Sequence, residues 1–182
     1  MQNSKIKKKI ITLIGPTACN KTSTAVHLIK KFPISIIGVD SVQIYKRFNI
    51  GSAKPPKEIL EKYKHHLVDS ADPENIFSVK DFYDQAYRIV MQAHSNNRIP
   101  LLVGGTMMYF NALFKGINDI PEGNEAIREE LQRELDNRGV DKLFNELKEI
   151  DPESAKTIKQ NDKQRIMRAL EVFKISGKKI SD

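Results

Sequence analysis

Residues 15–22, GPTACNKT, place a glycine, a lysine and a threonine at the spacing of a phosphate-binding loop. In such a loop, backbone N–H groups and the N-terminus of the following helix bind phosphate oxygens. Lys21 would reach across the phosphates, and the hydroxyl group of Thr22 would hold Mg²⁺. The alternative is an ordinary strand–helix turn with an incidental Lys-Thr pair. We interpret the segment as a diphosphate-binding site made of Gly15, Pro16, Thr17, Ala18, Cys19, Asn20, Lys21 and Thr22.

The loop departs from its pattern at Asn20, where the motif demands glycine. Asn is the residue other than glycine that best tolerates a left-handed backbone, so we expect the loop to keep its shape with modest strain. The side chain of Asn20 could still crowd the ligand.

A second chemical feature is an acid that is missing. An ordinary P-loop ATPase carries an acidic residue at the end of a later apolar strand, where it acts at the metal. Here the run IPLLV, residues 99–103, is followed by Gly104, Gly105 and Thr106. We therefore predict binding of a diphosphate without hydrolysis of a triphosphate.

Asp40 ends another apolar run, IIGVD at 36–40, and is a candidate site residue. Open parallel sheets bind their ligands at the carboxyl ends of the strands, which is where this carboxylate would lie. Two other interpretations are an N-cap for the next helix and a ribose-binding acid of a dinucleotide fold. The glycine spacing is not GxGxxG, which disfavours the second.

These residues must be positioned by strands and helices that alternate along the first 115 residues. Apolar runs without alternation at 9–14, 36–40 and 99–103 predict buried strands, and 67–69 predicts a short one. Helices are predicted at 22–32 and at 79 to about 94, the second after a capping box at 78–81. A third helix is predicted after Gly105 and continues through Leu113. Met107, Met108, Tyr109 and Phe110 are expected in the core, and His65 and His66 are interpreted as structural. The pattern predicts an α/β fold with a P-loop NTPase-like parallel sheet and helices on both faces, spanning residues 1–118.

The character of the chain changes after Pro121, where strand candidates end. Helical patterns follow at 124–137, 141–150, 152–158 and 163–175, separated by turn signals. We predict a helical insertion subdomain over residues 119–182.

Composition favours a polyanionic partner. The 182 residues include 30 Lys and Arg against 23 Asp and Glu, a formal charge of +7, and basic side chains that contact phosphates release counterions. No apolar run is long enough for a transmembrane helix, so no membrane partner is expected. The single cysteine, Cys19, fits a cytoplasmic protein, and we expect a monomer.

Four collinear segments resemble the tRNA dimethylallyltransferase (isopentenyltransferase) family: residues 15–22, 39–55, 99–116 and 161–178, with 65–69 in agreement. The family usually has Ser-Gly where this chain has Cys19-Asn20. The resemblance covers the family's N-terminal portion, so we expect the helical subdomain to be incomplete. It implies transfer of a dimethylallyl group from dimethylallyl diphosphate, with Mg²⁺, to the N6 amine of the adenosine 3′ of the anticodon in tRNA.

The resemblance also implies roles for individual residues. Asp40 would be the general base for the amine, and Thr106 would lie near the reacting centre. Contacts to the anticodon stem-loop of tRNA would come from Asp40, Ser41, Val42, Gln43, Thr106, Arg128, Gln164, Arg165, Ile166, Met167 and Arg168. Thr106 could instead be a helix cap, and the three arginines could be solvated surface charges.

Two other functions are compatible with the sequence. One is a small-molecule enzyme, either an isopentenyltransferase acting on a free adenine nucleotide or a nucleotide kinase. The other is a truncated or degenerate remnant that binds RNA without turnover, for which Asn20 is the main argument. The basic helical subdomain and the QRIMR segment at 164–168 favour a macromolecular acceptor.

Overall fold

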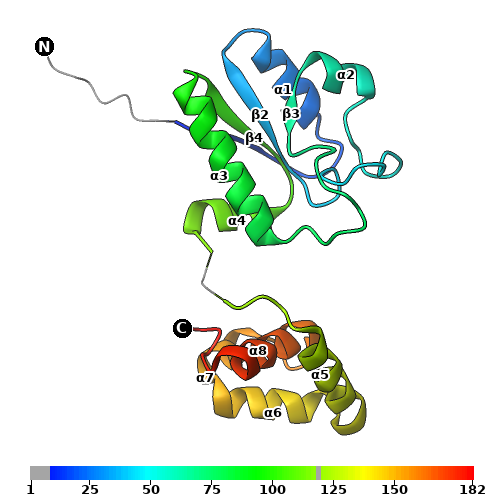
Figure 1. Cartoon of the computed structure of the whole chain (residues 1–182), viewed down its shortest axis with the longest axis vertical. Helices are drawn as coiled ribbons and strands as arrows, with labels where there is room; N and C mark the ends of the chain where they lie inside the picture. Colours follow the sequence, from blue (N-terminus) through cyan, green and yellow to red (C-terminus); the bar gives the residue numbers. More distant parts are fainter. Residues whose placement is uncertain (1–8, 118–119) are drawn as a thin grey trace, which may run out of the picture. The chain divides into compact units, whose positions relative to one another are not determined.

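Four parallel strands form the sheet that carries the phosphate loop, in the order β1-β4-β2-β3 (Figure 1). They are β1 (Ile11–Ile14), β2 (Ile34–Val39), β3 (His65–His66) and β4 (Ile99–Gly104). The computed structural model describes residues 9–117 and 120–182. The chain divides between residues 117 and 118 into an α/β unit and a helical unit, each taken separately below.

The two central strands are buried because helices cover both faces of the sheet. All six residues of β2 are buried, and its side chains alternate between the faces. Ile34 and Ile36 pack with α1 (Lys21–Ile29), while Ile37 and Val39 pack with α3 (Val79–Ser95) and α4 (Met107–Lys115). The predicted α/β class, with a parallel sheet between layers of helices, is confirmed.

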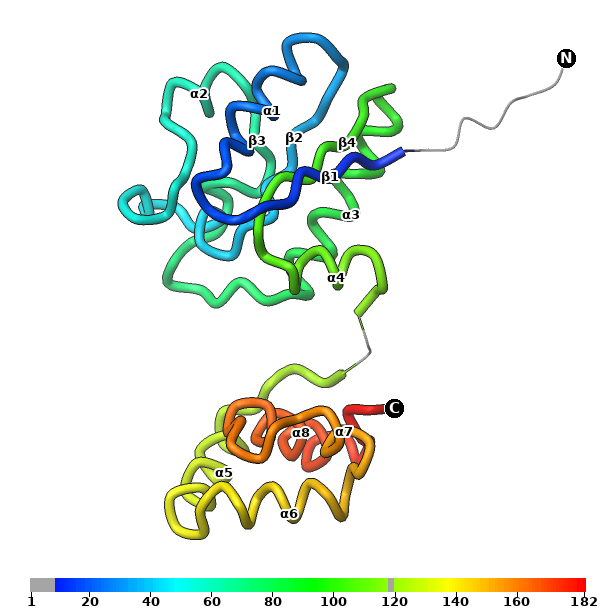
Figure 2. Tube along the Cα trace, turned by 180° about the vertical axis from the view of Figure 1, so that it is seen from behind, coloured from blue at the N-terminus to red at the C-terminus, as the bar shows by residue number. Residues whose placement is uncertain are grey.

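The first strand is shorter and more exposed than predicted. It covers Ile11–Ile14 instead of residues 9–14, and Ile11 and Ile14 are 42% and 45% exposed. The reason is its place in the sheet, because β1 pairs with β4 along one side only (Figure 2). An apolar run predicts a strand, but it does not say whether that strand lies at an edge.

The prediction of a strand at 67–69 is wrong by two residues. The strand is His65–His66, paired with Ile36 and Ile37 of β2. Leu67 and Asp69 have φ of 59° and 51°, a left-handed conformation that a strand cannot contain. Burial lowers the pKa of both histidine rings, in keeping with their structural interpretation.

The helices of the α/β unit follow the sequence pattern closely. Ser78 and Asp81 form the predicted capping box at the start of α3, and Phe82, Ala86, Val90 and Ala93 are buried. Phe82 of α3 stacks on Tyr109 of α4, with the ring centroids 4.1 Å apart. A short helix, α2 (Lys57–Lys62), was not foreseen.

Only half of the MMYF segment belongs to the core. Tyr109 and Phe110 are buried as predicted, but Met107 and Met108 are 51% and 56% exposed. The correction follows from helical geometry, since consecutive residues at the first turn of α4 point in different directions. Burial, with the nearby Tyr45 and Asp40, raises the pKa of Tyr109 to about 12.

Four helices make up the described part of the helical unit: α5 (Glu125–Arg138), α6 (Val140–Ile150), α7 (Pro152–Thr157) and α8 (Lys163–Ser176). Their boundaries lie within two residues of the predicted ones. Leu131, Leu143, Leu147 and Ile166 are fully buried at the centre of this unit. Across the described ranges, no helix is both long and apolar enough to cross a membrane.

Candidate active site

The phosphate loop connects β1 to α1 and contains two residues with left-handed backbones. Asn20, directly before α1, has φ 60° and ψ 25°, so the predicted left-handed conformation is confirmed. Ala18 has φ 66°, which the sequence did not indicate, because alanine rarely adopts this conformation. The loop therefore carries strain at two positions that glycine would relieve.

Lys21 turns back onto the loop that precedes it. Its Nζ donates hydrogen bonds to the carbonyl oxygens of Gly15, at 2.8 Å, and Pro16, at 2.5 Å. The Sγ of Cys19 lies 3.6 Å from the same ammonium. The carbonyl oxygens of Gly15 and Pro16 thus hold the ammonium group, and Lys21 lines the cavity described below.

Strand register brings the loop and Asp40 to one edge of the sheet. Gly104 is the pairing partner of Ile14 in β1 and of Val39 in β2, so the three strands end in one row. A Cβ on Gly104 would lie 1.9 Å from the carbonyl oxygen of Val39. Only glycine permits this close approach, and the phosphate loop and Asp40 begin directly beyond it.

Asp40 caps its own loop with one carboxylate oxygen. Its Oδ1 accepts the backbone N–H groups of Val42, at 2.9 Å, and Gln43, at 3.1 Å. The interpretation of Asp40 as the N-cap of the next helix is wrong, because a turn follows it and the next helix begins at Lys57; Oδ1 caps that turn instead. Within the described residues, no hydrogen bond reaches Oδ2. One oxygen fixes the side chain and the other is available for chemistry.

Thr106 joins the end of β4 to the turn after Asp40. Its Oγ1 accepts the backbone N–H of Ser41 at 3.0 Å and lies 3.4 Å from the Ser41 hydroxyl. Thr106 precedes α4 but makes no side-chain cap to that helix, so the cap interpretation is wrong. Its hydroxyl supports the loop that holds Asp40.

Gln43 extends the same turn toward a second loop. Its Nε2 donates to the carbonyl oxygens of Ser52 and Ala53 at 3.2 and 3.1 Å. Lys54 follows Ser52 and Ala53 in this second loop, and only 4% of its side chain is exposed. Its Nζ donates to the carbonyl oxygen of Tyr45 and to Asp69 Oδ1, at 2.8 and 2.6 Å.

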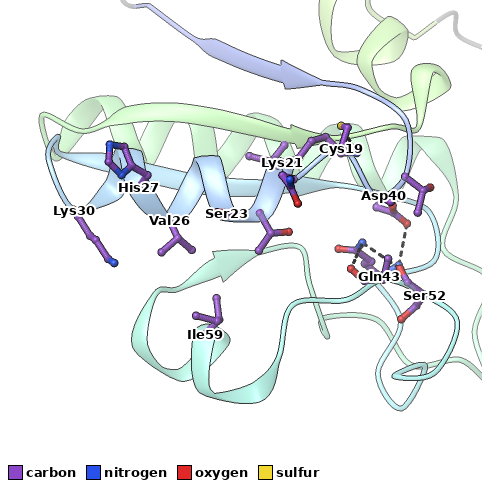
Figure 3. Close-up of a pocket in the computed structure, with 17 residues that line it drawn as sticks. Cys19, Lys21, Ser23, Val26, His27, Lys30, Asp40, Gln43, Ser52 and Ile59 are labelled. Atoms are coloured by element: carbon purple, nitrogen blue, oxygen red, sulfur yellow. Dashed lines mark hydrogen bonds between the residues drawn. The ribbon is translucent and has the colours of Figure 1, made fainter.

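These elements surround a cavity of about 580 Å³ (Figure 3). Residues 17–22 of the loop line it together with Asp40 and Gln43. Ser41, Val42 and Thr106 lie beside Asp40 and are not among its lining residues. Nine further lining residues were not predicted as site residues, namely Ser23, Val26, His27, Lys30, Ser52, Ala53, Ile59, Val103 and Gly104. Ser52 and Ala53 lie in the 39–55 segment, and the resemblance of that segment to the family could have identified them as site residues.

The cavity offers oxygen donors for a cation. Thr22 and Asp40 both line it, and Mg²⁺ prefers oxygen ligands while keeping several waters. The described ranges contain no group of three His, Cys, Asp or Glu residues that could hold a metal. A cation here would depend on a bound diphosphate for its remaining ligands, and this donor set fits Mg²⁺ on those terms.

The remaining predicted contacts lie in the helical unit, and two of them face its core. Ile166 is fully buried, so its side chain is not placed to contact tRNA, whereas Met167 packs against the same cluster and is only partly buried. Their position on the inner face of α8 is the physical reason. Gln164 is exposed, and Arg165, with 73% of its side chain exposed, pairs with Asp162.

Arg128 and Arg168 share one carboxylate partner. Arg128 Nε and Arg168 Nη1 donate to Glu171, at 2.8 and 2.6 Å. The exposed fractions of the two arginine side chains are 56% and 33%. The alternative interpretation of a solvated surface charge is therefore wrong for Arg168, whose guanidinium group is bonded at both ends. The sequence gave no recognised signal for Glu171.

Comparison with known proteins gives one consistent family. A family model described as IPP transferase matches residues 43–182. The tRNA dimethylallyltransferase of Vesicomyosocius okutanii is 46% identical over 177 residues, which are 97% of this chain and 58% of that protein. The chain spans about half the length of the curated relatives it matches.

Solved structures agree with the fold. The full-length tRNA isopentenylpyrophosphate transferase of Bacillus halodurans is 40% identical, with a TM-score of 0.59 over 94% of this chain and 57% of that one. A eukaryotic dimethylallyltransferase acting on tRNA is 29% identical, with a TM-score of 0.79 over 96% of this chain and 43% of that one. The P-loop NTPase-like core predicted from sequence is thereby supported by structure.

Proposed function

The chain belongs to the IPP transferase family, and from this premise we propose that it forms the substrate-binding core of a tRNA dimethylallyltransferase. The reaction transfers a dimethylallyl group from dimethylallyl diphosphate to the N6 amine of the adenosine 3′ of the anticodon. One observation carries the proposal. The register of Ile14, Gly104 and Val39 places a phosphate loop and a carboxylate on the same cavity.

The leaving diphosphate would be bound by residues 15–22. Preorganised donors aimed at developing negative charge are a large source of catalysis. The N-terminus of α1 and the ammonium of Lys21 supply such donors, once phosphate oxygens replace the carbonyl oxygens of Gly15 and Pro16. Thr22 would hold Mg²⁺, with further ligands from the bound diphosphate, and the ion would neutralise diphosphate charge.

Asp40 would act on the acceptor. The exocyclic amine of adenine is a poor nucleophile because its lone pair is delocalised into the ring. A carboxylate oxygen that accepts an amine proton sharpens the attack as the carbon–oxygen bond to diphosphate breaks. The two hydrogen bonds on Oδ1 orient the carboxylate and leave Oδ2 for that proton.

The tRNA would be bound by exposed cations of the helical unit together with the 40–43 turn. Arg128 and Arg165 are its most exposed candidates for phosphate contacts. Phosphate contacts position the RNA, and the cavity then determines which base reacts. The proposed partner is the anticodon stem-loop.

The test is transfer of label from dimethylallyl diphosphate to three acceptors: a tRNA with adenosine beside its anticodon, the same tRNA with guanosine there, and free AMP. We expect label in the first alone. Label in AMP would favour the small-molecule isopentenyltransferase. ATP-dependent phosphorylation of AMP would favour the kinase. Tight tRNA binding with no transfer would favour the non-catalytic remnant.

A further inference from the structure

Glu171 is a buried carboxylate that no role assigned so far requires. Its side chain is 2% exposed, although α8 carries it on the surface of a small helical unit. It accepts hydrogen bonds from Arg128 Nε, Arg168 Nη1 and the backbone N–H of Asn124, at 2.8, 2.6 and 2.9 Å. Burial alone would raise the pKa of Glu171, but these hydrogen bonds hold it below its ordinary value. The group is therefore an ionised carboxylate with three donors.

The two arginines on this carboxylate are held differently. Arg168 also donates from Nη2 to the carbonyl oxygen of Pro121, at 2.7 Å, so both ends of its guanidinium group are occupied. Arg128 is fixed through Nε alone. Within residues 9–117 and 120–182, its two terminal nitrogens make no hydrogen bond. Arg168 is therefore held at both ends of its guanidinium group, whereas Arg128 is held at Nε and its side chain is 56% exposed.

Gly123 provides the surface on which the Arg128 guanidinium lies. A Cβ at position 123 would lie 1.9 Å from Nη2 of Arg128 and 2.5 Å from its Cζ. The backbone of Gly123 does not have a positive φ. A methyl group at this position would displace the guanidinium group of Arg128, so glycine is what allows the guanidinium group to lie here.

We propose that Glu171 and Gly123 are positioning residues that hold Arg128 in the orientation in which it binds an RNA phosphate. The inference rests on the proposed function, since it names how that function's RNA contact is built. A guanidinium group binds phosphate through paired N–H donors in a fixed plane, so fixing its plane beforehand lowers the entropy lost on binding.

The sign of one substitution separates positioning from simple electrostatics. Glu171→Gln removes a negative charge beside two arginines, and charge alone predicts tighter RNA binding. Positioning predicts weaker binding, because Arg128 loses its anchor. Glu130→Gln is the matched control. It removes a negative charge from α5 of the same unit, where the 52% exposed Glu130 pairs with Lys174 and not with Arg128.

The experiment measures binding of a labelled anticodon stem-loop across a salt series, with thermal unfolding recorded for each variant. We expect Glu171→Gln and Gly123→Ala each to weaken binding about tenfold, the size of one charge-assisted hydrogen bond. The slope of log affinity against log salt should fall by about one. Glu130→Gln should bind as the wild type does or more tightly.

Gly123→Ala keeps the test valid if Glu171→Gln unfolds the unit, because Gly123 is exposed and the charge is unchanged. In an Arg128→Ala background, Gly123→Ala should have no further effect on binding. Unchanged or tighter binding by Gly123→Ala, or equal losses with and without Arg128, would overturn the inference. Absence of RNA binding by the wild type would instead overturn the proposed function.

Discussion

The hydroxyl oxygen of Thr106 accepts the backbone N–H of Ser41 at 3.0 Å, across 65 residues of sequence. Through this bond, Thr106, two residues after β4, supports the turn after β2. Asp40 immediately precedes that turn, and Gly104 ends β4 two residues before Thr106. The bond therefore links the turn at Asp40 to β4, the strand that lies between β2 and β1. Geometry at this edge depends on cross-strand support as much as on the residues that face the ligand.

Replacing Thr106 with Val should therefore lower turnover while leaving diphosphate affinity nearly unchanged. The substitution keeps the shape but removes the acceptor for Ser41 N–H, a bond worth about 1 kcal/mol, or roughly fivefold in rate. Thr106→Ser should restore most of the loss. Single-turnover transfer and a separate diphosphate titration would check this, and an affinity loss in place of a rate loss would contradict it.

Asp40→Asn should reduce the transfer rate by about 10²–10⁴, the usual contribution of a general base. The amide oxygen can still accept the N–H groups of Val42 and Gln43, so the turn should survive. Diphosphate binding measured by calorimetry should be unchanged. Near-normal turnover, or loss of diphosphate binding, would assign Asp40 to metal or loop support.

Asn20→Gly should stabilise the phosphate loop in its bound conformation and tighten diphosphate binding, because φ of 60° costs an asparagine roughly 1 kcal/mol. Asn20→Val should weaken binding strongly, since a β-branched residue resists this conformation. Calorimetry with dimethylallyl diphosphate on the three forms gives the order. Equal affinities would show that the left-handed geometry does not matter to the ligand.

Lys54→Met should destabilise the α/β unit by about 3 kcal/mol, because it removes a buried cation and leaves the carbonyl oxygen of Tyr45 and the carboxylate of Asp69 without their donor. Asp69→Asn should cost less, since Asp69 is 40% exposed. Urea unfolding of the two variants would compare these costs. The prediction fails if the lysine variant is as stable as the wild type.

The helical unit should lose stability in acid through Asp151. Burial would raise the pKa of this carboxyl, but hydrogen bonds from Ser154 and Ser181 lower it below its ordinary 3.8. A depressed folded pKa gives stability that is complete above the unfolded pKa and is lost as the pH falls through the folded value. Asp151→Asn should therefore be less stable at pH 7 and show a shallower decline below about pH 4. Thermal unfolding followed by circular dichroism measures the stability at pH 7 and its loss in acid. If the variant loses stability in acid as steeply as the wild type, a group other than Asp151 is responsible.

Local sequence by itself determined most of the helices and strands. The phosphate loop at 15–22, the capping box at Ser78 and Asp81, the buried run of β2 and the helices after residue 124 depend on neighbours within a few positions, and short-range geometry decides them. The position of Asp40 could also be predicted, because the carboxyl end of a parallel strand has a known position relative to the sheet.

Only the tertiary structure decided which residues meet across long separations. The exposure of β1 depends on its place in the strand order, and the left-handed Leu67 and Asp69 depend on the loop that Lys54 holds. Glu171 becomes the anchor of Arg128 because α5 and α8 pack together, a contact across 43 residues. Burial and pairing are properties of the assembled core, and a pattern read along one segment does not contain the side chains that come from another.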